Sequence, residues 1–101
     1  MHFQLIHRST QLLQHFELVV TRGDYRHAKP DPDPYLTALA RLGLRADACL
    51  AIEDSERGLR AARAAGLRCW VVPSPLAREG SFAEADRVFA SLGELVTALG
   101  S

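Results

Sequence analysis

The hydrophobic residues form short continuous runs that are separated by longer segments of mixed polarity. These runs are Leu18–Val20, Leu50–Ile52, Trp70–Val72 and a weaker one at Val88–Phe89. Runs that are apolar throughout are typical of strands that are covered on both faces. Because helical segments alternate with these runs, the pattern predicts a parallel sheet with right-handed crossover connections.

The segments between the runs show hydrophobic residues at helical spacing, with clear start and stop signals. Each predicted helix begins at a side chain that can cap it and ends at a glycine: Asp33 and Gly43, Ser55 and Gly66, and Ser91 and Gly100. We expect the opening segment, Met1–Phe16, to form one more helix that leads into the first strand. We expect residues 73–86 to be irregular, because two prolines and a glycine interrupt them.

Composition limits the classes of protein to which the chain can belong. Of its 101 residues, 48% are hydrophobic and 24% are charged, which predicts one small globular domain. The twelve basic and twelve acidic side chains cancel, so there is no electrostatic basis for binding nucleic acid or an anionic membrane. No apolar run is long enough to cross a membrane, and the N-terminus lacks the pattern of a secretion signal.

Two cysteines, Cys49 and Cys69, each open an apolar run. They are too few and too far apart in sequence for a disulfide framework or a zinc site, so we expect buried, reduced thiols. Reduced thiols are typical of the cytoplasm, and we expect a cytoplasmic protein.

Two adjacent carboxylates, Glu53 and Asp54, follow the second apolar run. Ligands bind outside the carboxyl ends of the strands in an open parallel sheet, which gives this position weight. Neighbouring carboxylates repel each other and favour a counter-ion, and Mg²⁺ prefers such oxygen ligands. Helix capping explains the same dipeptide equally well, with Asp54 or Ser55 as the N-cap and Glu53 in solvent.

Two further candidate sites follow the first predicted strand. Residues 21–24 (Thr-Arg-Gly-Asp) come directly after it, and Lys29, the only lysine in the sequence, precedes Pro30 in the next loop. A lysine there can neutralise carboxylates or bind a phosphate oxygen, although an exposed loop lysine is the simpler interpretation. His27 is near enough in sequence to face the same site, but the four histidines show no metal-binding spacing.

The triplet Asp31-Pro32-Asp33 has the D-x-D spacing of an aspartyl nucleophile motif. Such a nucleophile is expected directly after an apolar strand, on a rigid support. This triplet instead leads into a helix and its prolines exclude strand geometry, so helix capping is the better interpretation. The sequence also contains no G-x-S-x-G motif and no glycine-rich phosphate loop.

Two segments together resemble the haloacid-dehalogenase superfamily, in particular the group that contains phosphoglycolate phosphatases and β-phosphoglucomutases. They are VVTRGDYRHAKPDPDPYLTALARLGL and CLAIEDSERGLRAARAAGLRCWVV. In that family a lysine in a K-P-x-P segment precedes a helix, and a later apolar strand ends in an acidic pair followed by serine. The resemblance covers about residues 16–75 and is specific, because both motifs and their spacing agree.

This resemblance implies roles for individual residues. Lys29 would steady the nucleophile and the transferring phosphoryl group. Glu53 and Asp54 would hold Mg²⁺ directly or through water, and Ser55 would shape the loop. The resemblance also identifies what is missing from this chain: the D-x-D-x-[TV] motif that holds the nucleophile, the phosphate-binding serine or threonine, and the cap domain that selects substrates.

We therefore predict an α/β fold, a partial Rossmann-like, three-layer domain with a short parallel sheet of three to four strands. Residues 1–101 would be the C-terminal portion of the family's core domain. The resemblance implies a Mg²⁺-dependent phosphatase that acts on a small phosphorylated metabolite through an aspartyl-phosphate, and this chain alone is expected to be inactive. The alternative is a non-catalytic homologue that binds partners or self-associates through the exposed edge of its sheet. A generic nucleotide-binding fold is a third hypothesis, which the absent glycine-rich loop argues against.

Overall fold

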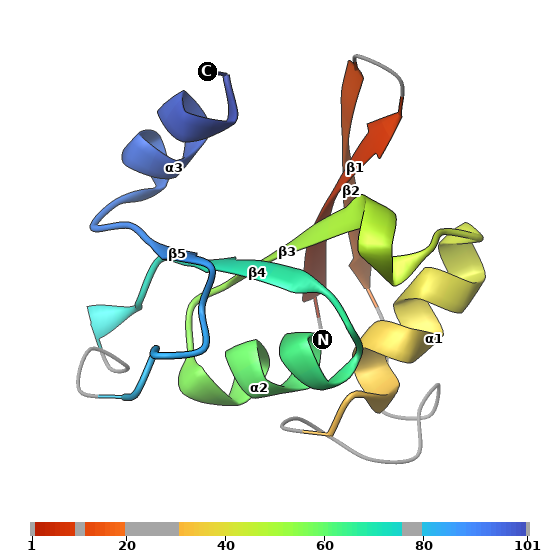
Figure 1. Ribbon diagram of the computed structural model, residues 1–101, viewed down its shortest axis with the longest axis horizontal. Coiled ribbons are helices and arrows are strands. Elements are labelled where there is room, and N and C mark those ends of the chain that lie inside the picture. Colours follow the sequence, from red (N-terminus) through yellow and green to blue (C-terminus); the bar gives the residue numbers. More distant parts are fainter. Residues whose placement is uncertain (1, 10–11, 20–30, 76–79, 101) are drawn as a thin grey trace.

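The computed structural model describes residues 2–9, 12–19, 31–75 and 80–100 (Figure 1). Over these residues, five strands form one sheet in the order β2-β1-β3-β4-β5. The elements are β1 (His2–Ser9), β2 (Leu12–Val19), α1 (Asp33–Leu42), the 3-10 turn η2 (Ala46–Ala48), β3 (Cys49–Glu53), α2 (Glu56–Ala64), β4 (Arg68–Val71), β5 (Arg87–Val88) and α3 (Leu92–Leu99). In Figure 1, α2 lies below β3 and β4 and α3 lies above them, so helices flank the sheet as predicted.

The parallel half of the sheet confirms three of the predicted strands. The apolar runs at 50–52, 70–72 and 88–89 correspond to β3, β4 and β5. β3 pairs in parallel with β4, with Ala51 opposite Cys69, and β4 pairs in parallel with β5, with Val71 opposite Val88. The alternation of strands and helices in the sequence therefore identified the topology of this half correctly.

The N-terminal half of the sheet differs from the prediction. The helix predicted over Met1–Phe16 is wrong for the residues that the structure describes there, because β1 and β2 pair as antiparallel strands, with Leu5 opposite Phe16. The run Leu18–Val20 contributes only its first two residues to β2, and Val20 lies outside the described residues. β2 is an edge strand next to β1, so it is not a parallel neighbour of β3.

Pairing with β3 explains why the opening segment is extended. β1 pairs antiparallel with β3, and its residues Leu5, Ile6 and His7 lie opposite residues 49–51. β4 pairs with only one edge of β3, and β1 forms the hydrogen bonds of the other edge. The same pairing buries Leu5 completely and Ile6 to 8% exposure. Helical spacing of a short segment is a weak preference that tertiary pairing overrides.

The three helices predicted after residue 30 form with the predicted stop signals, and two of them have the predicted cap. The Ser55 and Ser91 hydroxyls accept hydrogen bonds from backbone N–H groups three residues later, which caps α2 and α3. Gly43 and Gly66 follow α1 and α2 with φ of 67° and 86°, a left-handed conformation that favours glycine. Within the described ranges, no helix has the length and apolar character needed to span a membrane.

The hydrophobic core lies between the sheet and helices α1 and α2. Burial alternates along β3, so Cys49, Ala51 and Glu53 face these helices. The side of α2 that packs on the sheet carries Ala61 and Ala62, both fully buried, and these small side chains allow the helix to approach closely. The core residues are Leu5, Tyr35, Ala38, Leu39, Cys49, Ala51, Leu59, Ala61, Ala62, Ala65, Leu67, Cys69 and Val71.

Both cysteines belong to this core, as predicted. Neither Cys49 nor Cys69 forms a disulfide, and both are buried. Burial, together with the nearby negative charge of Asp47, raises the pKa of the Cys49 thiol, so it stays protonated near neutral pH. These cysteines therefore act as small apolar side chains.

Asp86 joins the sheet to the segment that leads into β5. Its backbone N–H donates to the Cys69 carbonyl oxygen at 2.9 Å, and its Oδ2 accepts from the Cys69 N–H at 2.7 Å. A guanidinium nitrogen of Arg63 lies 3.3 Å from the same carboxylate oxygen. One side chain thus connects β4, α2 and the segment before β5.

Replacing Asp86 with alanine is expected to lower the free energy of unfolding by about 1–3 kcal/mol, because the Cys69 N–H loses a charged acceptor. Urea denaturation of the two proteins measures this difference. Asp47→Ala is the control, since Asp47 pairs with Arg45 on the exposed surface and such pairs contribute at most about 1 kcal/mol. A loss in Asp86→Ala no larger than in Asp47→Ala would contradict the role given to Asp86.

Candidate metal-binding site

The two carboxylates at the end of β3 lie in different environments. Glu53 is 7% exposed, whereas Asp54 is exposed. Burial alternates along β3 and places Glu53 on the side of the helices, and Asp54 is the first residue after the strand. Backbone hydrogen bonds hold both residues. The Val72 N–H donates to the carbonyl oxygen of Glu53 at 2.9 Å, and the Ser74 N–H donates to the carbonyl oxygen of Asp54 at 3.1 Å. The acidic pair is therefore held against the end of β4.

The Glu53 carboxylate is enclosed by the first turns of two helices. Tyr35 in α1 is fully buried, and its hydroxyl donates a hydrogen bond to Oε2 of Glu53. Gly58 in α2 lies so close to the carboxyl group that a Cβ atom at this position would overlap it. Burial and the negative charge of Glu53 raise the pKa of Tyr35 well above its ordinary value of 10.0, so the hydroxyl keeps its proton at neutral pH.

Ser55 forms the cap that one of the two sequence interpretations requires. Its Oγ accepts a hydrogen bond from the Gly58 N–H at 3.1 Å. The capping interpretation also places Glu53 in solvent, whereas the structure buries this side chain. A buried carboxylate is costly unless it is paired or hydrogen-bonded, and the positive end of the α2 dipole favours it here. Capping alone therefore explains Ser55 but not Glu53.

The Asp31-Pro32-Asp33 triplet begins α1, as its capping interpretation requires. Asp31 Oδ1 accepts a hydrogen bond from the Asp33 N–H at 3.0 Å. The expectation that Asp33 itself caps the helix is wrong. Asp33 is the first helical residue, and Pro32 occupies the N-cap position without a side-chain hydrogen bond. Asp31 supplies the acceptor because it precedes the helix, and its side chain can bond to the N–H group of the first helical residue.

The candidate residues after the first predicted strand lie outside the described residues. These are Lys29, His27 and the segment 21–24. The described chain resumes at Asp31, directly before α1, so the structure positions the helix that follows Lys29 but not the lysine itself. The role of Lys29 stays a prediction.

The donor atoms of the acidic pair fit a magnesium ion. Mg²⁺ binds through one or two protein carboxylates, and water and phosphate oxygens complete its coordination. Asp54 offers an exposed carboxylate, and Glu53 offers a second one that is held in place. Among the residues that the structure describes, no group of three or more His, Cys, Asp or Glu side chains could hold a metal ion.

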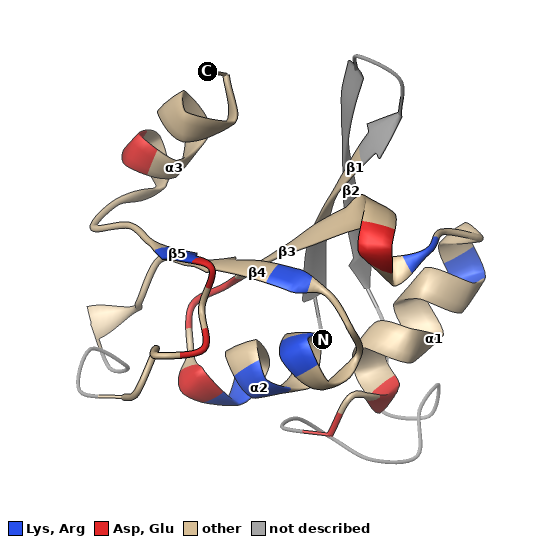
Figure 2. Ribbon diagram, in the orientation of Figure 1, with Lys and Arg blue, Asp and Glu red and all other residues tan. Residues whose placement is uncertain are grey.

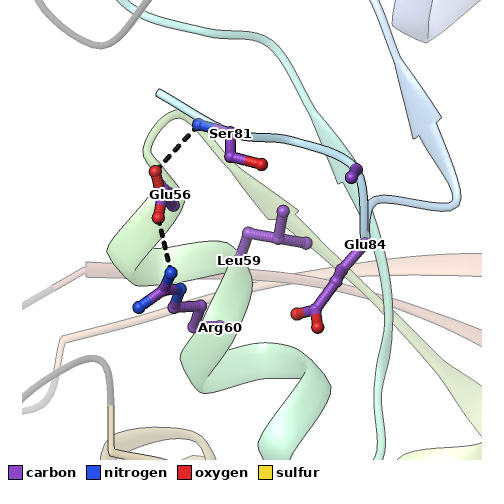
Figure 3. Close-up of a pocket in the computed structure, with 6 residues that line it drawn as sticks. Glu56, Leu59, Arg60, Ser81 and Glu84 are labelled. Atoms are coloured by element: carbon purple, nitrogen blue, oxygen red, sulfur yellow. Dashed lines mark hydrogen bonds and ion pairs between the residues drawn. The ribbon is translucent and has the colours of Figure 1, made fainter. Parts of the chain in front are cut away.

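Acidic residues continue from this pair into the first turn of α2, and the coloured residues in the rest of the helix are basic (Figure 2). Figure 3 shows Glu56 in the first turn of α2, where its carboxylate accepts from the Ser81 N–H at 2.8 Å and pairs with Arg60 at 2.9 Å. A hollow of about 370 Å³ beside them is lined by Glu56, Leu59, Arg60, Ser81, Ala83 and Glu84. The lining of this hollow does not include the acidic pair. The hydrogen bond from Ser81 to Glu56 holds the segment at Ser81 against α2.

Tyr35 is the residue near the acidic pair that the sequence interpretation missed. In the sequence it is one of the hydrophobic positions of α1, and helical spacing does not distinguish a buried tyrosine from a buried phenylalanine. The available signal was chemical, because the hydroxyl of a buried tyrosine usually finds a hydrogen-bond partner. The identity of that partner depends on tertiary packing between α1 and β3.

Known proteins resemble this chain in sequence and in structure. Residues 3–72 match the family described as haloacid dehalogenase-like hydrolase. The chain is 48% identical over 79 residues to the plasmid protein CbbY of Cupriavidus necator and 38% identical over 88 residues to the putative phosphatase YhcW of Bacillus subtilis. A mutant of CbbY from Rhodobacter sphaeroides, solved in complex with xylulose-(1,5)bisphosphate, matches with a TM-score of 0.67 and 48% identity.

These matches cover most of this chain but a minor part of each relative. The aligned regions are 78% of this chain and 31% of the Cupriavidus protein, and 87% of this chain and 40% of YhcW. The solved structure is matched over 68% of this chain and 31% of its own length. The chain thus spans about a third of the length of the relatives that it matches.

Alanine at position 58 is expected to destabilise the protein although alanine favours helices. Its methyl group would overlap the Glu53 carboxyl group, which must then move away from the Tyr35 hydroxyl. Losing a buried hydrogen bond to a charged group costs about 1.5–3 kcal/mol, and the better helix propensity returns only about 1 kcal/mol. We expect urea denaturation to show a net loss of roughly 0.5–2 kcal/mol.

Gly93→Ala is the matched control for this substitution. Gly93 lies in the first turn of α3, where a Cβ atom would meet only the Ser91 Oγ at 3.8 Å. This variant is expected to be as stable as the native protein or slightly more stable. Equal stability of the Gly58→Ala and Gly93→Ala variants would show that Glu53 is not held against Gly58.

Proposed function

Because the chain belongs to the haloacid dehalogenase-like hydrolase family, we propose that it forms the metal-binding part of a Mg²⁺-dependent phosphatase. The acidic pair is the observation that supports this most strongly, since a buried, fixed Glu53 adjoins an exposed Asp54. The pair lies at the carboxyl end of a strand in the parallel half of the sheet. That position is where ligands bind in folds of this kind.

The two acids have different roles in this proposal. Asp54 is exposed, so its carboxylate can contact the ion, while Glu53 is held in place and acts directly or through a water molecule. Bound Mg²⁺ would offset the negative charge of a phosphoryl group during its transfer. Lys29 would place a positive charge near the same phosphate, as the family resemblance implies. Ser55 keeps the first turn of α2 in position and so maintains the shape of the loop.

We propose a small phosphorylated metabolite of the sugar-phosphate class as the substrate. The support comes from relatives, because the matching CbbY mutant was solved with xylulose-(1,5)bisphosphate and YhcW is named a putative phosphatase. The sequence contains no D-x-D-x-[TV] motif, so these 101 residues contribute the metal site but no recognisable aspartyl nucleophile. The relatives do not support the alternative of a non-catalytic module.

We also propose that the protein works in the cytoplasm. Cys49 and Cys69 are buried and form no disulfide, which fits a compartment that keeps thiols reduced. The equal numbers of basic and acidic side chains support a small-molecule partner rather than nucleic acid or an anionic membrane.

Asp54→Asn is expected to weaken Mg²⁺ binding by roughly tenfold or more, because the amide removes the charge of the exposed ligand. Isothermal titration calorimetry with MgCl₂ measures the affinities. Asp47→Asn is the control, since Asp47 is an exposed carboxylate at the opposite end of β3, and it is expected to leave the affinity unchanged. If native protein and Asp54→Asn bind Mg²⁺ equally, the acidic pair serves only to shape the turn.

The chain by itself is expected to hydrolyse p-nitrophenyl phosphate no faster than its Asp54→Asn variant does. The physical reason is that a metal ion and a lysine polarise the phosphate but cannot replace an attacking carboxylate. Release of p-nitrophenol in the presence of MgCl₂ gives the rate. Rapid hydrolysis that is lost in Asp54→Asn would reveal another nucleophile, and Asp24→Asn would be the first variant to examine.

A further inference from the structure

One hydrogen bond joins the start of α1 to the strand that carries the proposed metal site. Tyr35 lies in the first turn of α1, the helix that follows Lys29, and Glu53 ends β3. The Tyr35 hydroxyl donates to Oε2 of Glu53 although the two residues are 18 positions apart in sequence. Both are buried, with exposures of 0% for Tyr35 and 7% for Glu53. This contact connects the start of α1 to the carboxyl end of the strand.

Gly58 confines the same carboxylate from the side of α2. A Cβ atom at Gly58 would overlap the carboxyl group of Glu53, so only glycine leaves room for it. The carboxylate therefore lies between a donor on α1 and the backbone of α2. A ligand that is already held in one orientation needs little further ordering when a metal ion binds.

The chemical nature of this donor suits a metal site. A lysine or arginine in the same place would largely cancel the negative charge of Glu53. A hydroxyl satisfies one carboxylate oxygen and adds no positive charge of its own. Packing of the core requires only the aromatic ring, which phenylalanine would also supply. The hydroxyl is thus the part of Tyr35 whose presence packing does not explain.

We propose that Tyr35 is a positioning residue whose hydroxyl orients the Glu53 carboxylate for Mg²⁺ binding by the acidic pair. This inference rests on the proposed Mg²⁺ site and adds to it a residue from another element. Tyr35 needs no contact with the metal or with substrate, because it acts through Glu53. The same hydrogen bond couples the helix that follows Lys29 to the loop that carries Asp54.

Tyr35→Phe tests this proposal, since it removes the hydroxyl and keeps the ring. Isothermal titration with MgCl₂ is expected to show an affinity about tenfold lower than that of the native chain, the usual effect of losing a group that supports a ligand. Leu95→Val is the control, because Leu95 is a buried residue of α3, on the opposite side of the sheet from α2 (Figure 1). It lowers stability without contacting Glu53 and is expected to keep the native affinity. A Tyr35→Phe variant that binds Mg²⁺ as tightly as the native chain overturns the proposal.

A measurement without metal separates this inference from the proposed function. In protein labelled with ¹³C at the glutamate carboxyl carbons, Glu53→Gln identifies the Glu53 resonance. Tyr35→Phe is expected to shift this resonance toward that of an exposed glutamate such as Glu84, and Leu95→Val is expected to leave it unchanged.

Each combination of results then has one meaning. If native protein and Asp54→Asn bind Mg²⁺ equally, the metal site is wrong, and a shifted Glu53 resonance in Tyr35→Phe still supports the orientation of Glu53 by Tyr35. An unshifted resonance overturns that orientation whatever the titrations show. Gly58→Ala provides a second variant, because it displaces the same carboxylate from the side of α2 and is expected to shift the same resonance.

Discussion

The turn after β3 depends on how one buried carboxylate is kept in place. An ionised side chain that is removed from water is costly unless hydrogen bonds and nearby charges compensate for the lost hydration. Glu53 receives a hydrogen bond from Tyr35 and lies beside the positive end of the α2 dipole, at a glycine that leaves room for it. The alanines of α2 bring this helix close enough to the sheet for that contact. Core packing and the candidate site are therefore parts of one arrangement.

The parallel half of the fold could be predicted because its signals are local. Each strand is a short apolar run, and each following helix begins at a residue that can cap it, as at Ser55 and Ser91. α2 ends before Gly66, where the chain takes a left-handed conformation that glycine adopts more readily than other residues. The acidic pair could be located for the same reason, since Glu53 and Asp54 follow a strand that the sequence marks clearly. Glu53 lies at the end of β3, where the apolar run predicts that the strand ends.

The remaining features depend on contacts between distant parts of the chain, which local patterns do not contain. The opening segment is extended because β1 pairs with β3, although its hydrophobic spacing also fits a helix. The burial of Glu53 depends on Tyr35 and Gly58, which come from two other elements. The pair thus combines a buried acid with an exposed one, a difference that their adjacency in sequence does not reveal.

The central claim is that this acidic pair binds a divalent cation, and paramagnetic broadening by Mn²⁺ tests it most directly. Mn²⁺ accepts the same carboxylate and water ligands as Mg²⁺ and broadens the NMR signals of nearby amide groups. We predict the strongest broadening at the amides of residues 53–58 and at those of Val72 and Ser74, which donate hydrogen bonds to the backbone of the acidic pair, and little at Asp47. Broadening that is absent around Asp54, or that is spread evenly over exposed acids such as Glu84 and Glu94, would contradict the account.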